Sequence, residues 1–191
     1  SEDVSALKDL PPKLRKEKKF ILKAIKSCEF SLLPLYYLDD DLKKDKEIVF
    51  EAIIKEVRGH RYTSNLVMFE TPFKFAHESL KKDREFVLKV VKQNGFALKY
   101  VAPSLQKDEE VVLLAIEDFE TLEYSSGPVI LHADKSLQKN KEFILKAIEK
   151  NSEVFEHISS NFKKDPEILE QVKNTKWWNE YGPIYGLKEN L

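Results

Sequence analysis

One short pattern recurs six times along the chain, and this recurrence constrains the fold more than any other feature of the sequence. Each copy contains an acidic or amide residue near its start, followed by an apolar segment. The clearest copy begins at Leu80 with the residues LKKDREFVLKVVKQNG. The other copies begin near Leu14, Leu42, Leu105, Leu137 and Phe162. A pattern repeated along a chain predicts an array of similar structural units.

Two features of the pattern indicate that each copy is a helix. Asp or Asn, whose short side chains accept a hydrogen bond from an unsatisfied backbone N–H, occupies the capping position in five copies. These residues are Asp45, Asp83, Asp108, Asn140 and Asp165. Apolar residues at the third, fourth, fifth, seventh and eighth positions after the cap cover an arc of about 200° on a helix. An arc so wide predicts that each helix packs between two neighbours, and that residues such as Phe86 and Leu145 are buried.

We therefore expect an all-α fold, an irregular α-solenoid-like array of about six short helical hairpins. Residues 1–191 are predicted to form one helical-repeat domain. The segment 1–13 is expected to cap its N-terminal end, and the aromatic segment 176–191 its C-terminal end. Only five glycines occur and helix-forming residues dominate, which also favours an α fold. The alternative is an ordinary helical bundle whose helices resemble one another by coincidence.

Two irregular insertions, 57–77 and 124–132, interrupt the regular spacing of the copies. Insertions into repeat proteins often form the binding face. The side chains in these insertions that suit binding are Arg58, His60, Arg61, Tyr62, His77 and His132. If both insertions protrude on the same side, these side chains line one pocket. For the histidines themselves, we favour the interpretation that they are exposed loop residues without a role.

Charge and hydropathy exclude several classes of partner. The 32 basic and 33 acidic residues balance, so no nucleic-acid binding is expected. Pairs of basic residues precede most caps, as at Lys81-Lys82. They could form a ridge that binds phosphates or acidic peptides. Alternatively, they lie near the C-terminal end of the preceding helix, where positive charge interacts favourably with the helix dipole. We favour the second interpretation. No apolar run approaches the length of about 20 residues that spans a bilayer, and no signal peptide is visible, so a cytoplasmic location is expected.

The sequence contains no recognisable catalytic or metal-binding motif. The four histidines lack the spacing of a zinc site, and the single cysteine, Cys28, has no partner for a thiol-rich site. The acidic run Asp39–Asp41 contains oxygen ligands suited to a divalent cation, but a solvated acidic turn is the favoured interpretation. We therefore predict no catalytic residues, no metal and no cofactor.

The copy that begins at Leu80 resembles the repeat family called domain of unknown function 4116 (DUF4116). Units of that family contain Asp-x-Glu, a Gln-Asn-Gly turn and an Ala-Leu-x-Tyr-Ala helix. Here Asp83 and Glu85, the run Gln93-Asn94-Gly95 and the run Ala97-Leu98-Lys99-Tyr100 match these features. The resemblance implies small helical hairpins in tandem, as found in microbial proteins that include bacterial effector-like ones. It implies no activity and no catalytic residues.

These observations lead to a first functional hypothesis, a non-enzymatic helical-repeat module that binds another protein. The first alternative is a ligand-binding or enzymatic domain with a pocket at the 57–77 and 124–132 insertions. The second alternative is the recognition domain of a bacterial effector-like protein, which would be delivered to a host cytosol. The identity of the partner and the oligomeric state do not follow from the sequence.

Overall fold

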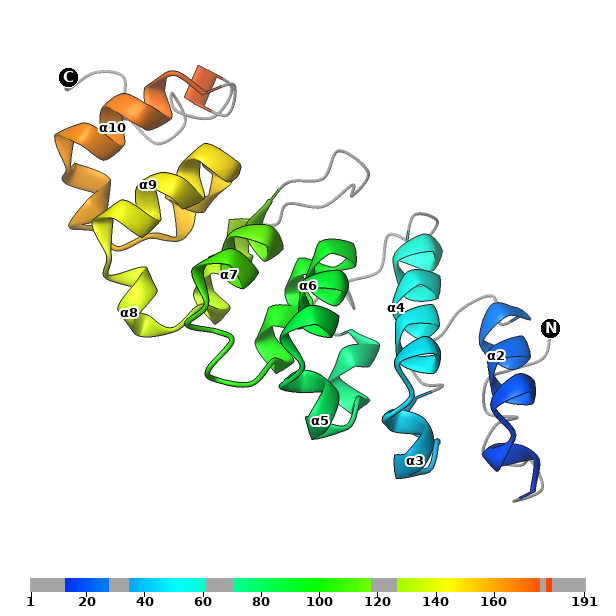
Figure 1. Ribbon diagram of the computed structural model, residues 1–191. Helices are drawn as coiled ribbons and strands as arrows, with labels where there is room; N and C mark the ends of the chain where they lie inside the picture. Colours follow the sequence, from blue (N-terminus) through cyan, green and yellow to red (C-terminus); the bar gives the residue numbers. More distant parts are fainter. Residues whose placement is uncertain (1–12, 28–34, 61–70, 118–126, 176–177, 180–191) are drawn as a thin grey trace. The chain divides into compact units, whose positions relative to one another are not determined.

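A computed structural model describes residues 13–27, 35–60, 71–117, 127–175 and 178–179 (Figure 1). Every regular element in these segments is helical, which confirms the predicted all-α class. The chain divides into two compact units, Ser1–Leu105 and Gln106–Leu191. The two predicted caps, 1–13 and 176–191, lie outside the described residues except for Lys13, Trp178 and Asn179. The single-domain and solenoid-like arrangements therefore stay predictions.

The described residues of the first unit include three long helices, and a short helical element directly precedes each of them. In chain order its elements are η1 (Leu14–Lys16), α2 (Lys18–Ser27), α3 (Asp40–Lys43), α4 (Lys46–His60), η2 (Pro72–Phe75), α5 (Glu78–Lys81), α6 (Arg84–Gln93) and η3 (Gly95–Tyr100). Helix α4 contacts both α2 and α6, so the three long helices lie side by side in chain order (Figure 1). The predicted packing between two neighbours is confirmed for α4.

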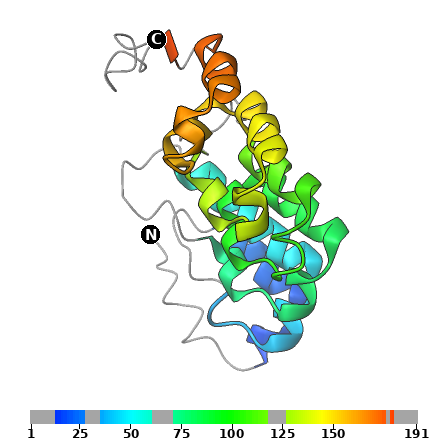
Figure 2. The same ribbon diagram turned by 90° about the vertical axis from the view of Figure 1, so that its left-hand side faces the viewer.

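The second unit repeats this plan. Its elements are α7 (Glu109–Ile116), η4 (Gly127–His132), α8 (Lys135–Gln138), α9 (Lys141–Lys150), η5 (Ser152–His157), η6 (Phe162–Lys164) and α10 (Pro166–Lys173). Helix α9 contacts α7 on one side and α10 on the other. The yellow α9 and the orange α10 lie next to each other in both Figure 1 and Figure 2.

The predicted capping residues begin the long helices. Asp83 accepts a hydrogen bond from the backbone N–H of Phe86 at 3.0 Å, and Asn140 accepts one from Phe143 at 3.3 Å. Asp45 accepts two, from Glu47 and Ile48, as Asp108 and Asp165 do at their own helices. Each cap satisfies N–H groups that have no partner within the helix, a contribution of about 1 kcal/mol.

The buried stripe of the long helices is narrower than the sequence pattern predicts. In α6, Phe86, Val87, Val90 and Val91 are buried, whereas Leu88 at the fifth position is only half-buried. Leu145 holds the same position in α9 and is also half-buried. The prediction that the fifth position belongs to the core is therefore wrong. The two neighbouring helices cover the other four positions and leave this one at the edge of their contact.

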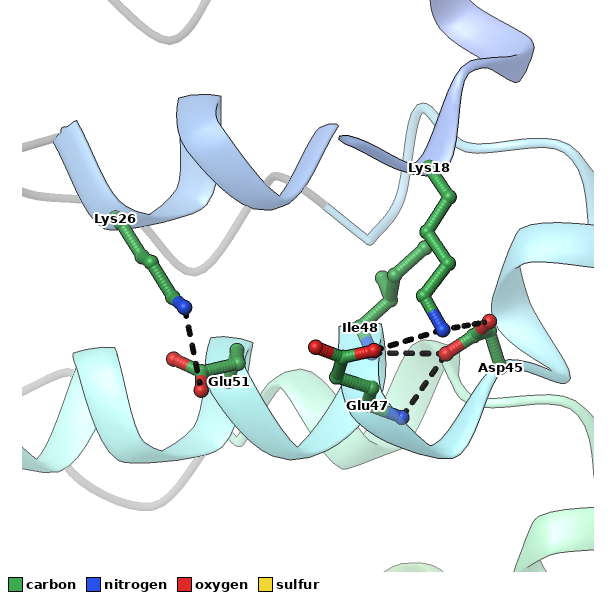
Figure 3. A network of polar contacts seen from close by, with 6 residues as sticks. All are labelled: Lys18, Lys26, Asp45, Glu47, Ile48 and Glu51. Carbon is green, nitrogen blue, oxygen red and sulfur yellow. Dashed lines mark hydrogen bonds and ion pairs between the residues drawn. The ribbon is translucent and has the colours of Figure 1, made fainter. Parts of the chain in front are cut away.

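Charged side chains at the starts of the long helices join neighbouring helices. Lys18 of α2 reaches the carboxylates of Asp45 and Glu47 at the start of α4, at 2.7 and 2.8 Å (Figure 3). At the other end of α2, Lys26 faces Glu51 at 3.7 Å (Figure 3). The first residue after the cap of one helix thus binds the cap of the next helix. One carboxylate therefore serves both its own helix and the junction.

The same junction recurs in both units. Lys46 at the start of α4 pairs with the cap residue Asp83 of α6. Lys141 at the start of α9 pairs with Asp165 and Glu167 of α10, both at 2.8 Å. These lysines, through their hydrogen bonds, lower the pKa of Asp83 and of Asp165. A lowered pKa means that the stabilisation is fully present above the ordinary value of about 4 and is lost as the pH falls through the lowered value.

Substitutions along α6 test the narrower buried stripe. Phe86→Ala should lower the free energy of unfolding by about 3–5 kcal/mol, because it leaves a cavity in the core. Leu88→Ala should cost about 1–2 kcal/mol, because its side chain is already half-exposed. Lys89→Ala should change the free energy by less than about 0.5 kcal/mol. Urea unfolding followed by circular dichroism measures all three, and equal losses for Phe86 and Leu88 would contradict the assigned burial.

Two substitutions of Asp45 separate its capping role from its role at the junction. Asp45→Asn keeps a capping side chain and removes only the charge, so it should cost less than about 1 kcal/mol. Asp45→Ala removes both interactions and should cost about 1–2 kcal/mol. Urea unfolding at neutral pH gives both values. If the Asn variant loses as much as the Ala variant, the cap contributes nothing here.

Candidate functional site

The short 3-10 helices that follow the long helices share one feature. Four of them, η2, η3, η4 and η5, end at a residue whose side chain carries a ring. These final residues are Phe75, Tyr100, His132 and His157, and all four are half-buried. The residue before each ring is Lys74, Lys99, Leu131 or Glu156. All of these except the half-buried Glu156 are exposed.

The backbone shows that these positions are equivalent. His77 donates its N–H to the carbonyl of Lys43, Ala102 to that of Lys81, and Asp134 to that of Gln106, all at 2.9–3.0 Å. Each donor follows the ring residue by two positions. The turn at 35–38 belongs to the same set, because Leu38 donates to Leu35 as Ala76 donates to Phe73. Tyr37 is therefore equivalent to the ring residues of the 3-10 helices, and Tyr36 is equivalent to the residues that precede those rings.

We call Tyr37, Phe75, Tyr100, His132 and His157 the ring positions. We call Tyr36, Lys74, Lys99, Leu131 and Glu156 the outer positions. A 3-10 helix has three residues per turn, so side chains three apart face the same way. In η2 and the residue after it, Phe73 and Ala76 are buried and Lys74 is exposed, whereas Phe75, which faces the same way as the buried Pro72, is half-buried. In the described residues, five repeats each have one half-buried ring position and one outer position beside it.

In the first unit these positions form an aromatic and cationic surface. Tyr36 packs edge-on against Tyr37 and against Phe75, with ring centroids 5.0 and 5.3 Å apart. The ammonium groups of Lys74 and Lys99 lie over the ring that follows each of them, at 5.8 and 5.3 Å. Because η2 packs against η3, these side chains belong to adjacent helices. Contacts of this kind hold both the rings and the positive charges in place.

In the second unit the same positions are less basic. Helix η4 packs against η5, and the outer positions hold Leu131 and Glu156. The ring positions hold His132 and His157. Burial lowers the pKa of His157, so its ring is neutral at pH 7. The two units therefore share a backbone arrangement but present different side chains.

Exposed large apolar side chains are rare in the described part of the chain, and they share one position. Tyr36 is 56% exposed and Leu131 is 49% exposed. Both hold the outer position of their repeat, although nearly 100 residues separate them in the sequence. Single exposed apolar residues are ordinary on a protein surface. Their occurrence at one equivalent position in both units marks this position as a candidate contact site.

Most of the site residues predicted from the sequence cannot be placed. Arg61 and Tyr62 lie outside the described residues, and so do the side chains of Arg58 and His60 at the end of α4. The predicted pocket between the two insertions therefore stays a prediction. His77 and His132 are described. Residues 57–60 continue helix α4, and the described later parts of the two insertions contain the helices η2 and η4, so these parts are not irregular as predicted.

The structure gives His77 a local role that the sequence analysis missed. Its Nδ1 accepts a hydrogen bond from the backbone N–H of Ser79 at 3.1 Å and lies 2.8 Å from the Ser79 hydroxyl. His77 is thus the N-cap of α5. Asp134 caps α8 in the same way, through the N–H of Ser136 at 2.9 Å. His132, in contrast, occupies a ring position.

The acidic and basic runs pair with one another. Asp40 and Asp41 contact Lys43 and Lys44 at 3.7 and 3.5 Å, and Lys16 contacts Asp39 at 3.7 Å. The acidic run is solvated, as predicted, but it is not a turn, because Asp39 precedes α3 and Asp40 and Asp41 form its first turn. The described residues include no group of three His, Cys, Asp or Glu side chains placed to hold a metal ion. None of the described helices has the length and apolar character needed to cross a membrane.

Substitution of His77 tests its role as a cap. His77→Asp should leave the free energy of unfolding unchanged or slightly raised, because Asp is the better cap and already serves α8. His77→Ala should lower it by about 1 kcal/mol. Thermal and urea unfolding measure both variants. A loss for His77→Asp as large as that for His77→Ala would show that His77 acts through some contact other than the cap.

Comparison with known proteins places the repeats in a family. The model of the family described as "Domain of unknown function (DUF4116)" matches residues 69–106, 83–138, 108–163 and 140–172. These overlapping matches extend over residues 69–172, which is more than half of the 191-residue chain. The chain matches no curated protein and no solved structure. As its Asp-x-Glu and Gln-Asn-Gly motifs predict, the chain belongs to the DUF4116 family.

Proposed function

We propose that this chain is a non-enzymatic helical-repeat protein that binds another protein through the ring and outer positions of its short 3-10 helices. The observation that carries the proposal is the placement of Tyr36 and Leu131, the exposed large apolar residues of the described segments, at the same outer position. His132, predicted as a binding residue from the sequence, lies beside Leu131 in this set.

The chemistry of these positions suits a protein partner. Aromatic side chains bury a large area at a low cost in conformational entropy, and they are enriched where proteins bind one another. Tyr36 is already held by Tyr37 and Phe75, so little of its motion remains to be lost on binding. Such a held, half-exposed ring has the character of a binding hot spot.

The packing of the repeats supports the same conclusion. The buried stripe of each long helix and the buried residues of each 3-10 helix stabilise the fold. The outer positions belong neither to the buried residues of the long helices nor to those of the 3-10 helices. Core packing therefore does not restrict which side chains occupy them. Repeat proteins commonly use such positions to build an extended binding surface.

The proposal is tested first by finding the partner and then by measuring its affinity. The wild-type chain, immobilised, should retain a specific protein from a lysate of its source cells, identified by quantitative mass spectrometry. That protein, purified, should bind the double variant Tyr36→Ser with Leu131→Ser at least about tenfold more weakly, since a hot spot is worth more than about 1 kcal/mol. Isothermal titration calorimetry measures the affinity.

A control pair changes exposed residues on the long helices instead. Lys89→Ser with Glu149→Ser should bind the partner as the wild-type chain does. A third variant, with Arg58, His60 and Arg61 all changed to Ala, examines the 57–77 insertion. Binding that survives the Tyr36 and Leu131 changes, or that is lost only in the third variant, would overturn the proposed surface. Failure to retain any specific protein would overturn the proposed function itself.

A further inference from the structure

We propose that His77 is a pH-sensitive cap, which holds the start of α5 while its ring is neutral and releases it when the ring gains a proton. Nδ1 of the ring accepts a hydrogen bond from the backbone N–H of Ser79 at 3.1 Å. An imidazole nitrogen that carries a proton cannot accept a hydrogen bond. Capping of α5 by Nδ1 and protonation of Nδ1 therefore exclude each other. This switch goes beyond the proposed binding function and does not depend on it.

The capping state requires one particular neutral form of the ring. Because Nδ1 accepts the N–H of Ser79, the single proton of the neutral ring lies on Nε2. The Ser79 hydroxyl also lies 2.8 Å from Nδ1, so both polar groups of Ser79 are close to this nitrogen. His77 is half-buried and Ser79 is exposed. Water therefore reaches the pair, and the ring can take up a proton without prior unfolding of its surroundings.

The protonated ring makes a different contact with the same residue. Nδ1 then carries a proton and donates it in a hydrogen bond to the Ser79 hydroxyl oxygen, its neighbour at 2.8 Å. The backbone N–H of Ser79 lies in the first turn of α5, where a helix supplies no acceptor of its own, so it loses its cap. Loss of a cap lowers the folding equilibrium constant about fivefold. Mild acid therefore weakens the start of α5.

The chemistry of the imidazole sets the pH range of the switch. Histidine changes its charge between about pH 8 and pH 5, a range in which aspartate and lysine side chains keep theirs. The cap is present at the upper end of this range and is lost toward the lower end. Because the bond from Ser79 forms only with the neutral ring, proton binding favours the open form of this segment.

Glu78 is the carboxylate that follows His77 in the chain. The hydrogen bond from Lys81, at 2.8 Å, lowers the pKa of Glu78, and the charges of Lys81, Lys82 and His77 lower it further. Glu78 is therefore ionised throughout the range in which a histidine titrates, and it does not share the transition. Its negative charge stabilises the protonated ring, which favours release of the cap in acid.

The other elements around His77 carry charged groups whose charge is constant in this range. The backbone N–H of His77 bonds to the carbonyl of Lys43 in α3, and the side chain of Lys43 faces Asp40 at 3.7 Å. Helix α6 packs against α5, and its cap Asp83 pairs with a lysine of α4. In η2, the ammonium of Lys74 lies over the ring that follows it. All four are aspartates or lysines, so the change between about pH 8 and pH 5 belongs to His77.

The second unit has an equivalent cap that does not titrate in this range. Asp134 accepts the backbone N–H of Ser136 at 2.9 Å and the Ser136 hydroxyl at 2.6 Å. The hydrogen bonds from Ser136, that of the hydroxyl first, lower the pKa of Asp134. This carboxylate therefore caps α8 at every pH above about 4. Mild acid is thus expected to act on α5 and to leave α8 unchanged.

Two variants of the full chain test the switch by urea unfolding. Asn caps a helix without titrating, and Ala does not cap at any pH. At pH 8 the wild-type chain should match His77→Asn, and its folding equilibrium constant should exceed that of His77→Ala about fivefold. At pH 5 the wild-type chain should fall to the level of His77→Ala, while His77→Asn keeps its advantage. The other histidines are common to all three chains, so their contributions cancel in these differences.

Heteronuclear NMR reports on the cap itself. In the wild-type chain, the amide resonance of Ser79 should shift between pH 8 and pH 5 with the same midpoint as the ring protons of His77. In His77→Asn, the Ser79 amide should keep its position over this range. The reciprocal variant Asp134→His should transfer the response to the second unit, where the amide of Ser136 should follow the new histidine. The same spectra show that each variant is folded.

Three results would each overturn the switch. The first is a Ser79 amide that ignores the ionisation of His77, or that responds equally in His77→Asn. The second is a constant difference in stability between the wild-type chain and His77→Asn from pH 8 to pH 5. The third is an Asp134→His chain in which the Ser136 amide does not respond. None of these results bears on the proposed function, whose test is the dependence of a protein partner on Tyr36 and Leu131.

Discussion

The packing of neighbouring long helices within each unit is the constraint on which the rest of the structure depends. Burying a side chain the size of Phe86 stabilises the fold by about 2–3 kcal/mol, and every long helix buries several apolar side chains. The exposed ion pairs at the junctions contribute far less. Apolar contact therefore supplies the stability, and the polar groups decide how neighbouring helices align.

The alignment comes from the shared carboxylates. Asp45 caps α4 and binds Lys18 of α2, so the start of one helix is fixed against the start of the other. The backbone bond from His77 to Lys43 then fixes the turn that follows the next 3-10 helix. Once these points are fixed, the ring side chain of each described repeat is half-buried, and every outer side chain except that of Glu156 is exposed. The candidate surface is thus a direct consequence of the junction geometry.

The long helices could be predicted from the sequence because their signals are local. An Asp or Asn followed by the periodic apolar residues predicts the starts of α4, α6, α7, α9 and α10, and each of these helices begins directly after that residue. The half-burial of Leu88 could not be predicted, because it depends on how far two neighbours wrap around one helix. The type of the short helices could not be predicted either, since four to six residues do not distinguish a 3-10 helix from an α-helix.

The ring positions were missed, although a signal for them exists. The segments LYYLD, FKFAH, LKYVA, ILHAD and FEHIS align with one another, and the third residue of each carries a ring. The alignment is hidden because these segments follow stretches of unequal length, and only the junction bonds fix their register. The cap at His77 was missed because His is an unusual cap, although HESLKKD aligns with DKSLQKN and places His77 opposite Asp134.

The outer positions show how one repeat plan can serve different contacts. Tyr36, Lys74, Lys99, Leu131 and Glu156 are aromatic, cationic, aliphatic and anionic, yet the backbone places all of them alike. The fold tolerates each of these side chains, because other residues of the same short segment make the contacts with the core. Binding preference can therefore change from repeat to repeat without cost to the fold. A chain that keeps its buried pattern and its caps can therefore vary the side chains at the outer positions without loss of the packing that stabilises the fold.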